Sequence, residues 1–218
     1  MSLALFDLDN TLIGGDSDYL WGCFLAERGI VDGEWYQQQN QRFYDQYKAG
    51  ELDIYEFLRF QLQPLAEHAM TTLRDWRNQY LADKIEPILL PKAQTLIEQH
   101  RARGDTPVII TATNRFITAP IAALFDVDEL LATEPEIIAG RYTGGIRDVP
   151  CFQDGKVRKL TGWLDNRGET LTDSWFYSDS HNDLPLLNKV THPVAVDPDD
   201  ILRQHAGIHG WQVISLRD

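Results

Sequence analysis

Short runs of apolar residues recur along the chain, and several end abruptly at polar side chains. Leu3–Leu8, Pro107–Thr111 and Trp175–Ser178 are nearly continuous in apolar residues, Pro193–Val196 forms a fourth run, and Trp211–Ser215 is a candidate fifth. Continuous apolar runs of this length are typical of strands buried on both faces of a parallel sheet. The pattern therefore predicts the strands of such a sheet.

Helical segments separate these runs. Pro91–Arg103 starts with proline, which is favoured in the first turn of a helix, and stops at Gly104. Lys156–Asp165 and Asn182–Lys189 also have helical character. Because helices alternate with strands, the sequence predicts an α/β fold with a doubly wound, Rossmann-like parallel sheet.

Residues 16–87 differ from the rest of the chain. They contain no convincing strand, and 13 of the 23 aromatic residues fall between Tyr19 and Tyr80. Glu51–Leu62 places Leu52, Tyr55, Leu58 and Leu62 at helical spacing. We expect a helical insert at 16–87 within a core formed by 1–15 and 88–218. Its aromatic residues fit a small hydrophobic core, and they also fit a binding surface.

One further feature is the sequence IIAGRYTGGI at Ile137–Ile146. It predicts a β-hairpin that turns around Gly140–Arg141 and lies as a ribbon on the surface.

Composition and charge exclude several classes of protein. The net charge is −13 and the isoelectric point is near 4.8, which disfavours binding to nucleic acid or to anionic membranes. No segment approaches the roughly 20 apolar residues of a membrane helix, and the first residues do not resemble a signal peptide. We expect a soluble cytoplasmic protein in which Cys23 and Cys151 are free thiols.

Polar residues cluster where the first three apolar runs end, and a lysine opens the helix before the third run. Because parallel strands place their carboxyl ends at one edge of the sheet, we expect these residues to meet in a single site. They are Asp7 and Asp9, then Thr111, Ala112 and Asn114, then Lys156, and finally Asp179, Asn182 and Asp183.

Asp7 and Asp9 are separated by one residue, so on a strand they would share a face and repel each other. Oxygen ligands without histidine or cysteine at metal spacing favour a hard cation such as Mg²⁺. Lys156 and the Thr111 hydroxyl are not needed to bind a metal. They indicate an anion beside it, and phosphate fits.

Four segments together resemble the motifs of the haloacid dehalogenase-like superfamily. ALFDLDNTL resembles its first motif, hhhhDxDxT; VIITATN resembles the second, and YSDSHNDLP the fourth. Lys156 lies 23 residues before Asp179, the spacing of the third motif in the phosphoserine-phosphatase-like branch, so we prefer it to Lys159. The motifs occur in family order from Asp7 to Asp183.

The resemblance implies a phosphatase mechanism. Asp7 would attack phosphorus and form an aspartyl-phosphate, and Asp9 would act as general acid and then as general base. Thr111 and Lys156 would stabilise the phosphoryl oxygens. A phosphotransferase would keep the same residues, and so would a domain that only binds a phosphorylated metabolite.

The resemblance also implies a magnesium site and further phosphate contacts. The carboxylates of Asp7 and Asp179 and the backbone carbonyl of Asp9 would bind Mg²⁺. Asp183 would anchor a metal-bound water or orient Lys156. Additional phosphate-binding candidates are Ala112, Asn114 and Asn182.

The insert at 16–87 resembles the helical cap of this family, of the C1 type, which covers the site as a lid. Gly14 and Gly15 lie where a hinge would need backbone freedom. A small phosphorylated metabolite is therefore expected as substrate. The oligomeric state, monomer or homodimer, stays open.

Asp16 lies nine residues after Asp7, where an acidic residue of phosphoserine phosphatases contacts the substrate ammonium. Those enzymes usually have glutamate there, and the shorter aspartate suits a larger amine. Arg42 and Arg59 are candidates for binding a substrate carboxylate. The chain also resembles bacterial members described as histidinol-phosphatases. We therefore expect L-histidinol phosphate as substrate, with phosphoserine or another small phosphorylated metabolite as the alternative.

Overall fold

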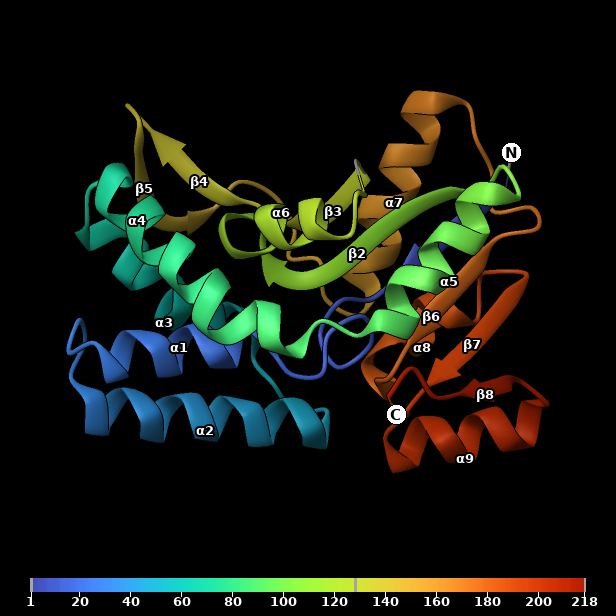
Figure 1. Cartoon of the computed structure of the whole chain (residues 1–218), viewed down its shortest axis with the longest axis horizontal. Coiled ribbons are helices and arrows are strands. Elements are labelled where there is room, and N and C mark those ends of the chain that lie inside the picture. Colours follow the sequence, from blue (N-terminus) through green and yellow to red (C-terminus); the bar gives the residue numbers. More distant parts are fainter. Residues whose placement is uncertain (1, 128, 218) are drawn as a thin grey trace.

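The computed structural model describes residues 2–127 and 129–217, and its centre is a six-stranded sheet (Figure 1). The strand order is β3-β2-β1-β6-β7-β8, and every pairing in it is parallel. The strands are β1 (Leu3–Phe6), β2 (Thr106–Asn114), β3 (Glu129–Thr133), β6 (Trp175–Ser178), β7 (His192–Val196) and β8 (Gln212–Ile214). The predicted doubly wound architecture is confirmed.

The strands differ from the prediction at two points. β3 pairs with β2 at the edge of the sheet and was missed, because its sequence ELLAT is short and begins with an acidic residue. β1 ends at Phe6, so Asp7 and Asp9 lie beyond the strand. The expectation that they share one face of a strand therefore does not apply to them.

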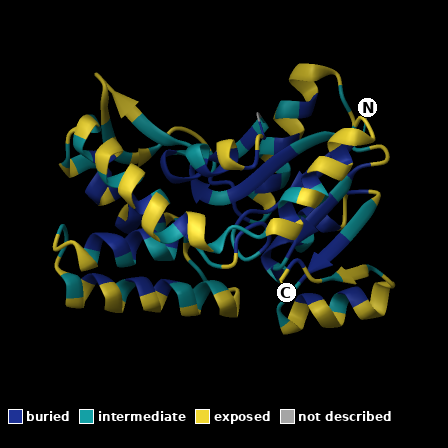
Figure 2. Ribbon diagram, in the orientation of Figure 1, coloured by how far each residue is buried: buried dark blue, intermediate teal, exposed yellow. Residues whose placement is uncertain are grey.

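The core helices pack on both faces of the sheet. They are α5 (Pro91–Ala102), α6 (Arg115–Leu124), α7 (Asp154–Arg167), α8 (Leu184–Leu187) and α9 (Asp200–His209), with the 3₁₀ turn η3 (His181–Asp183) before α8. In β1, Ala4 and Phe6 join one hydrophobic cluster while Leu3 and Leu5 join another. Alternate side chains thus enter opposite layers, which explains the continuous apolar run and the buried centre in Figure 2.

The stretch expected to be a helical insert, residues 16–87, contains α1 (Ser17–Glu27), α2 (Gly33–Ala49), α3 (Ile54–Glu67), α4 (Met70–Tyr80), the π-helix η1 (Leu81–Ile85) and the 3₁₀ helix η2 (Glu86–Ile88), which ends one residue beyond it. Six of its 13 aromatic residues are buried in hydrophobic clusters. Trp21 packs against Phe24 and Tyr80, with ring centroids 5.6 and 5.2 Å away. The helix expected over Glu51–Leu62 is present from Ile54 onward, so Leu52 precedes it. Leu58 and Leu62 are buried, whereas Tyr55 is 54% exposed.

The two chain segments that join the insert to the sheet contact each other. The Gly14 amide donates to the Ile88 carbonyl at 2.8 Å, and the Leu90 amide donates to the Leu12 carbonyl at 3.3 Å. A Cβ atom at Gly15 would press on the side chains of Ile88 and Leu20, at 3.2 and 3.3 Å. The absence of a side chain at Gly15 therefore also allows this close packing, in addition to any hinge role.

The predicted hairpin is present as β4 (Pro135–Ile138) and β5 (Arg141–Ile146). Its turn is Ala139–Gly140, one residue earlier than predicted, and both residues have positive φ, 49° and 77°. It is more than a surface ribbon: β5 packs against α3, and Tyr142 contacts the ring of Phe116 at 5.6 Å. The hairpin therefore braces the insert against the sheet.

None of the helices within 2–127 and 129–217 has both the length and the apolar character needed to cross a bilayer.

Gly155 gives a test of how the loop before α7 is built. A Cβ atom there would overlap the carbonyl oxygen of Pro150, so Gly155→Ala must displace the segment that carries Lys156. We expect the variant to lose about 1–3 kcal/mol of stability in urea unfolding, as overpacked sites do, and to lose activity. Gly162→Ala, in the same helix and with open space around its Cβ, is the control and should unfold at the same or higher urea. Equal midpoints for both variants would contradict this account.

Candidate active site

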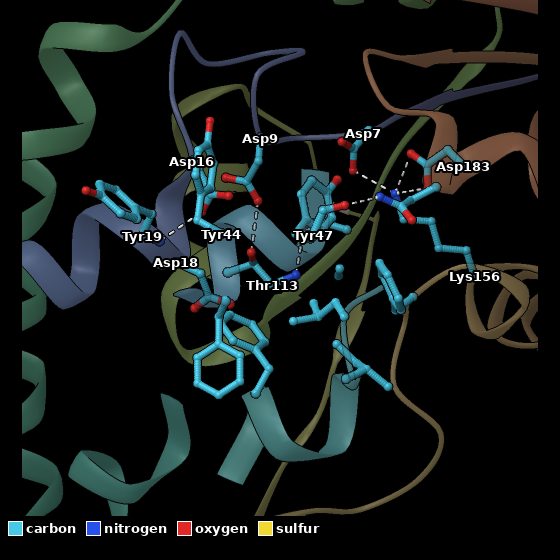
Figure 3. A pocket seen from close by; sticks show the side chains of 18 of the residues that line it. Asp7, Asp9, Asp16, Asp18, Tyr19, Tyr44, Tyr47, Thr113, Lys156 and Asp183 are labelled. Carbon is cyan, nitrogen blue, oxygen red and sulfur yellow. Dashed lines mark hydrogen bonds and ion pairs between the residues drawn. The ribbon is translucent and has the colours of Figure 1, made fainter. Parts of the chain in front are cut away.

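A buried lysine forms ion pairs with two aspartates at the carboxyl edge of the sheet (Figure 3). These contacts connect three segments that are distant in the sequence. Lys156 Nζ, in the first turn of α7, donates to Asp7 Oδ1 at 2.8 Å and to Asp183 Oδ2 at 2.7 Å. Ser178, the last residue of β6, donates its hydroxyl to Asp183 at 2.7 Å. The lysine is only 3% exposed. Lys159, the other candidate, instead pairs with Asp148 at 2.6 Å.

Electrostatics in this cluster follow from burial and from the excess of carboxylates. Burial raises the pKa of Asp7 to about 7; Lys156 opposes the shift, while Asp183 and Asp9 add to it. Burial alone would lower the pKa of Lys156, but Asp183 and Asp7 outweigh it, so the pKa is raised. The ammonium therefore stays charged at any physiological pH.

Asp179 lies beside this cluster and is held by Thr11. The Thr11 hydroxyl donates to Asp179 Oδ1 at 3.2 Å and accepts from the Asp179 amide at 3.1 Å. Burial raises the pKa of Asp179 well above its usual value, and the charges of Asp7 and Asp183 raise it further. Asp179 faces a neighbouring cavity that shares Tyr44 and Tyr47 with the pocket containing Asp7.

The carboxylate oxygens of Asp7, Asp179 and Asp183 are suitable ligands for a hard cation, although they do not form a complete coordination shell. Among the described residues, no three histidine, cysteine or acidic side chains converge as a complete metal site. Mg²⁺ typically uses one or two carboxylates and keeps several waters, so it does not need such a cage. The charges of Asp7 and Asp183 raise the pKa of Asp179, and Lys156 is the one ammonium among the described residues that contacts this cluster, so a bound cation would relieve the excess charge.

The Asp9 carboxylate points away from Lys156, toward the insert. Its Oδ1 accepts from the Ser17 amide at 2.6 Å, and its Oδ2 accepts from the Thr113 hydroxyl at 2.9 Å. Burial raises the pKa of Asp9 to about 6, and Asp16 adds to the shift. Near neutral pH, a group with this pKa can both give and take a proton.

The structure brings some of the phosphate-binding candidates to the pocket and leaves another outside it. Thr111, Ala112 and Asn182 line the pocket. Asn182 donates to the Tyr47 carbonyl at 3.0 Å and so links η3 to α2. Asn114 is not among the lining residues: its Oδ1 caps α6 by accepting from the Ile117 amide at 3.3 Å.

Asp16 and Asp18 line the insert side of the pocket, at the start of α1. Asp16 is the N-cap and accepts from the Tyr19 amide at 2.8 Å. Burial raises the pKa of both aspartates, that of Asp18 far above its usual value. Sequence reasoning missed Asp18, and it gave Thr113, at the end of the second apolar run, no role in the site. The spacing of two residues from Asp16 and from Thr111 is the signal that could have found them.

Aromatic rings form much of the remaining wall, contributed by Tyr19, Phe43, Tyr44, Tyr47, Phe57 and Phe152. Of the described lining residues, Lys156 alone is basic. Arg42 pairs with Glu56 at 2.8 Å, and Arg59 donates to the Tyr55 carbonyl; neither lines the pocket. The structure thus brings neither candidate arginine to the site.

A parallel α/β sheet whose carboxyl edge gathers these aspartates, a threonine and a buried lysine defines a haloacid dehalogenase-type hydrolase. In agreement, residues 4–188 match the family model described as haloacid dehalogenase-like hydrolase. The chain belongs to this family.

Individual relatives give a more specific comparison than the family model. A histidinol-phosphatase from Neisseria meningitidis is 42% identical, and the match covers 99% of each chain. A Bordetella pertussis protein of unknown function has a solved structure with a TM-score of 0.93 and 44% identity, covering 99% of this chain and 98% of its own. A phosphoserine phosphatase, solved as an analogue of its phospho-aspartyl intermediate, has a TM-score of 0.73 at 17% identity, covering 99% and 93%. The last match shows the shared fold.

Asp7→Asn tests the electrostatics of the site. Because the folded protein raises the pKa of Asp7 from 3.8 to about 7, ionisation of this carboxyl opposes folding. The penalty is absent below pH 4, grows as the pH rises, and is complete above about pH 7. In EDTA at pH 8 we expect Asp7→Asn to melt above the wild type by at least roughly 2 °C, with a smaller difference at pH 5.

Asp53→Asn is the matched control, because Asp53 is an exposed N-cap of α3 and asparagine caps equally well. Its melting temperature should follow the wild type at both pH values. If Asp7→Asn melts below the wild type at pH 8, the attraction of Lys156 exceeds the burial penalty and the account is wrong.

Proposed function

We propose that this enzyme is a magnesium-dependent phosphomonoesterase for small amino-alcohol phosphates, with L-histidinol phosphate as its substrate. The observation that carries the proposal is the charge of the pocket. Asp16 offers a carboxylate to a substrate ammonium, while Lys156, the one basic side chain among the described lining residues, is held by Asp7 and Asp183. The pocket therefore offers a counter-charge to the ammonium of a substrate but not to a substrate carboxylate.

Catalysis would begin at Asp7. One carboxylate oxygen attacks phosphorus as the bond from phosphorus to the leaving-group oxygen breaks, giving an aspartyl-phosphate. Asp9 transfers its proton to the departing oxygen, so the leaving group departs as a neutral alcohol. Asp9 then takes a proton from water as that water attacks phosphorus, which releases phosphate and restores Asp7.

Lys156 and Thr111 support both displacements. The Lys156 ammonium, oriented by Asp183 at 2.7 Å, holds the Asp7 carboxylate and would contact an equatorial phosphoryl oxygen. Thr111 is fully buried and lines the pocket, so its hydroxyl needs no desolvation when phosphate binds. Magnesium, held by the carboxylates of Asp7 and Asp179 and the carbonyl of Asp9, would offset the repulsion between an anionic nucleophile and an anionic ester.

The helical insert fits the role of a lid. We divide the chain into a core of residues 1–15 and 88–218 and a cap of residues 16–87. The space inside the pocket is about 50 Å³, so we expect the cap to move away when a substrate enters. Asn182 and the Tyr47 carbonyl form one of the contacts that closure would make.

The Neisseria relative supports this assignment. The Neisseria relative at 42% identity is named for histidinol phosphate, whereas the phosphoserine phosphatase structure shares the fold at 17%. Phosphoserine carries a carboxylate, and neither Arg42 nor Arg59 reaches the pocket to bind it. We also place the enzyme in the cytoplasm, where Cys23 and Cys151, both free, would stay reduced.

Phosphate release from a panel of esters tests the substrate. With Mg²⁺ we expect L-histidinol phosphate to exceed both phosphoserine and glycerol 3-phosphate in kcat/KM by at least about tenfold. Glycerol 3-phosphate lacks the ammonium and so loses one charge-assisted hydrogen bond, whereas phosphoserine adds a carboxylate for which the described lining residues offer no free cation. EDTA should abolish turnover and added Mg²⁺ should restore it. If glycerol 3-phosphate equals histidinol phosphate, amine recognition is wrong. Transfer of phosphate to a second alcohol, without release, would instead identify a phosphotransferase.

Asp16→Asn tests the ammonium contact. Asparagine keeps the N-cap of α1, so the helix should persist while the charge is lost. We expect KM for L-histidinol phosphate to rise roughly 10-fold or more with little change in kcat. Hydrolysis of 4-nitrophenyl phosphate, which has no amine, serves as the control and should be unaffected. Loss of activity on both esters would contradict a role confined to the amine.

A further inference from the structure

Asp18 is a buried carboxylate that the catalytic steps above do not use. It lines the active-site pocket yet is only 5% exposed, which places it deeper than the half-buried Asp16. In Figure 3 it lies with Asp9, Asp16 and Thr113 on the side away from Lys156. Its Oδ1 accepts from the side-chain Nδ2 of Asn114 at 3.3 Å, a long hydrogen bond.

The charge of Asp18 has no cationic partner among the described residues. Lys156, the basic side chain of the pocket, already contacts Asp7 and Asp183. The neighbours of Asp18 are instead neutral groups, Asn114 and the Thr113 hydroxyl, and other carboxylates. A buried carboxylate without a cation is costly unless a ligand supplies the missing donor. A carboxylate accepts up to about four hydrogen bonds, so Asp18 keeps acceptor capacity for one.

The surrounding walls indicate what kind of donor would fit. Phe43 and Phe57 line the same pocket and contact each other edge to face, with ring centroids 5.4 Å apart. Tyr19 and Tyr44 form a second pair at 5.3 Å. Aromatic faces beside a carboxylate bind flat or cationic nitrogen groups through stacking and cation–π attraction. A wall of this kind makes few favourable contacts with a simple aliphatic hydroxyl group.

The amide neighbours cannot take this role. Asn40 also lines the pocket, but it donates to the Tyr19 carbonyl at 2.9 Å and accepts from Gln61 at 3.3 Å. Both ends of its side chain are therefore engaged within the insert. Among the described lining residues, Asp18 remains a carboxyl group at this depth with acceptor capacity to offer.

We propose that Asp18 determines specificity for leaving groups that carry a second nitrogen donor beyond the ammonium. Asp16 binds the ammonium near the phosphate, and Asp18 accepts a hydrogen bond from the ring N–H of an imidazole deeper in the pocket. This deepens the proposed function and rests on it, because an imidazole-bearing amino-alcohol phosphate supplies both donors. Esters with one amine, such as phosphoethanolamine, leave Asp18 without a partner.

Kinetics with three esters test the proposal: L-histidinol phosphate, phosphoethanolamine and 4-nitrophenyl phosphate. Asp18→Asn should raise KM for L-histidinol phosphate by roughly tenfold or more, and change kcat/KM for the other two by less than about twofold. Asp16→Asn should weaken both amine-bearing esters. Asp53→Asn, outside the pocket, should change none. An equal loss on all three esters in Asp18→Asn, or a loss in kcat alone, overturns the specificity role.

A binding measurement separates this proposal from the proposed function, since it needs no turnover. L-histidinol should raise the melting temperature of the wild type more than ethanolamine does, and Asp18→Asn should lose that difference. If histidinol phosphate is not hydrolysed but this difference persists, the substrate assignment fails and the role of Asp18 stands. If the wild type shows no difference between the two amines, the proposal is wrong even when histidinol phosphate is turned over.

Discussion

The buried contact of the Lys156 ammonium with Asp7 and Asp183 is the constraint on which the site depends. The three residues come from the start of α7, the end of β1 and the turn after β6. Removing three charges from water is costly, and an ion pair between them recovers that cost only with good geometry. The distances of 2.8 and 2.7 Å show such geometry. The lysine thus fixes the direction of the proposed nucleophile before a substrate binds.

The pocket has two halves with opposite electrostatic needs. Around Lys156 a cation and a phosphate would complete the charge balance, and the core supplies Asp7, Lys156 and Asp183 there. Around Asp16 and Asp18 the carboxylates belong to the insert, and no described basic residue in the lining compensates them. Asp9 lies between, bonded to Thr113 of the sheet and to the Ser17 amide of the insert. Asp9, the proposed acid–base group, therefore contacts both halves of the pocket.

The insert contacts the core at several separated points. The crossing segments pair through Gly14 and Ile88, the β4–β5 hairpin packs on α3, and Asn182 reaches the Tyr47 carbonyl. The last contact lies at the pocket, which both Asn182 and Tyr47 line. In the proposed lid motion it is the contact that would break and re-form as a substrate passes.

The sequence by itself determined the parallel sheet, the helical insert and the order of the polar clusters. Apolar runs and strand-end carboxylates are local properties, and the 23-residue spacing from Lys156 to Asp179 was enough to prefer it to Lys159. Only the tertiary structure decided which polar residues meet. Asn114 turned back to cap α6, Tyr55 faced solvent, and Arg42 and Arg59 stayed outside the pocket. Asp18 entered the site because α1 packs against the end of β2. These outcomes depend on contacts between segments far apart in the chain, which no local pattern records.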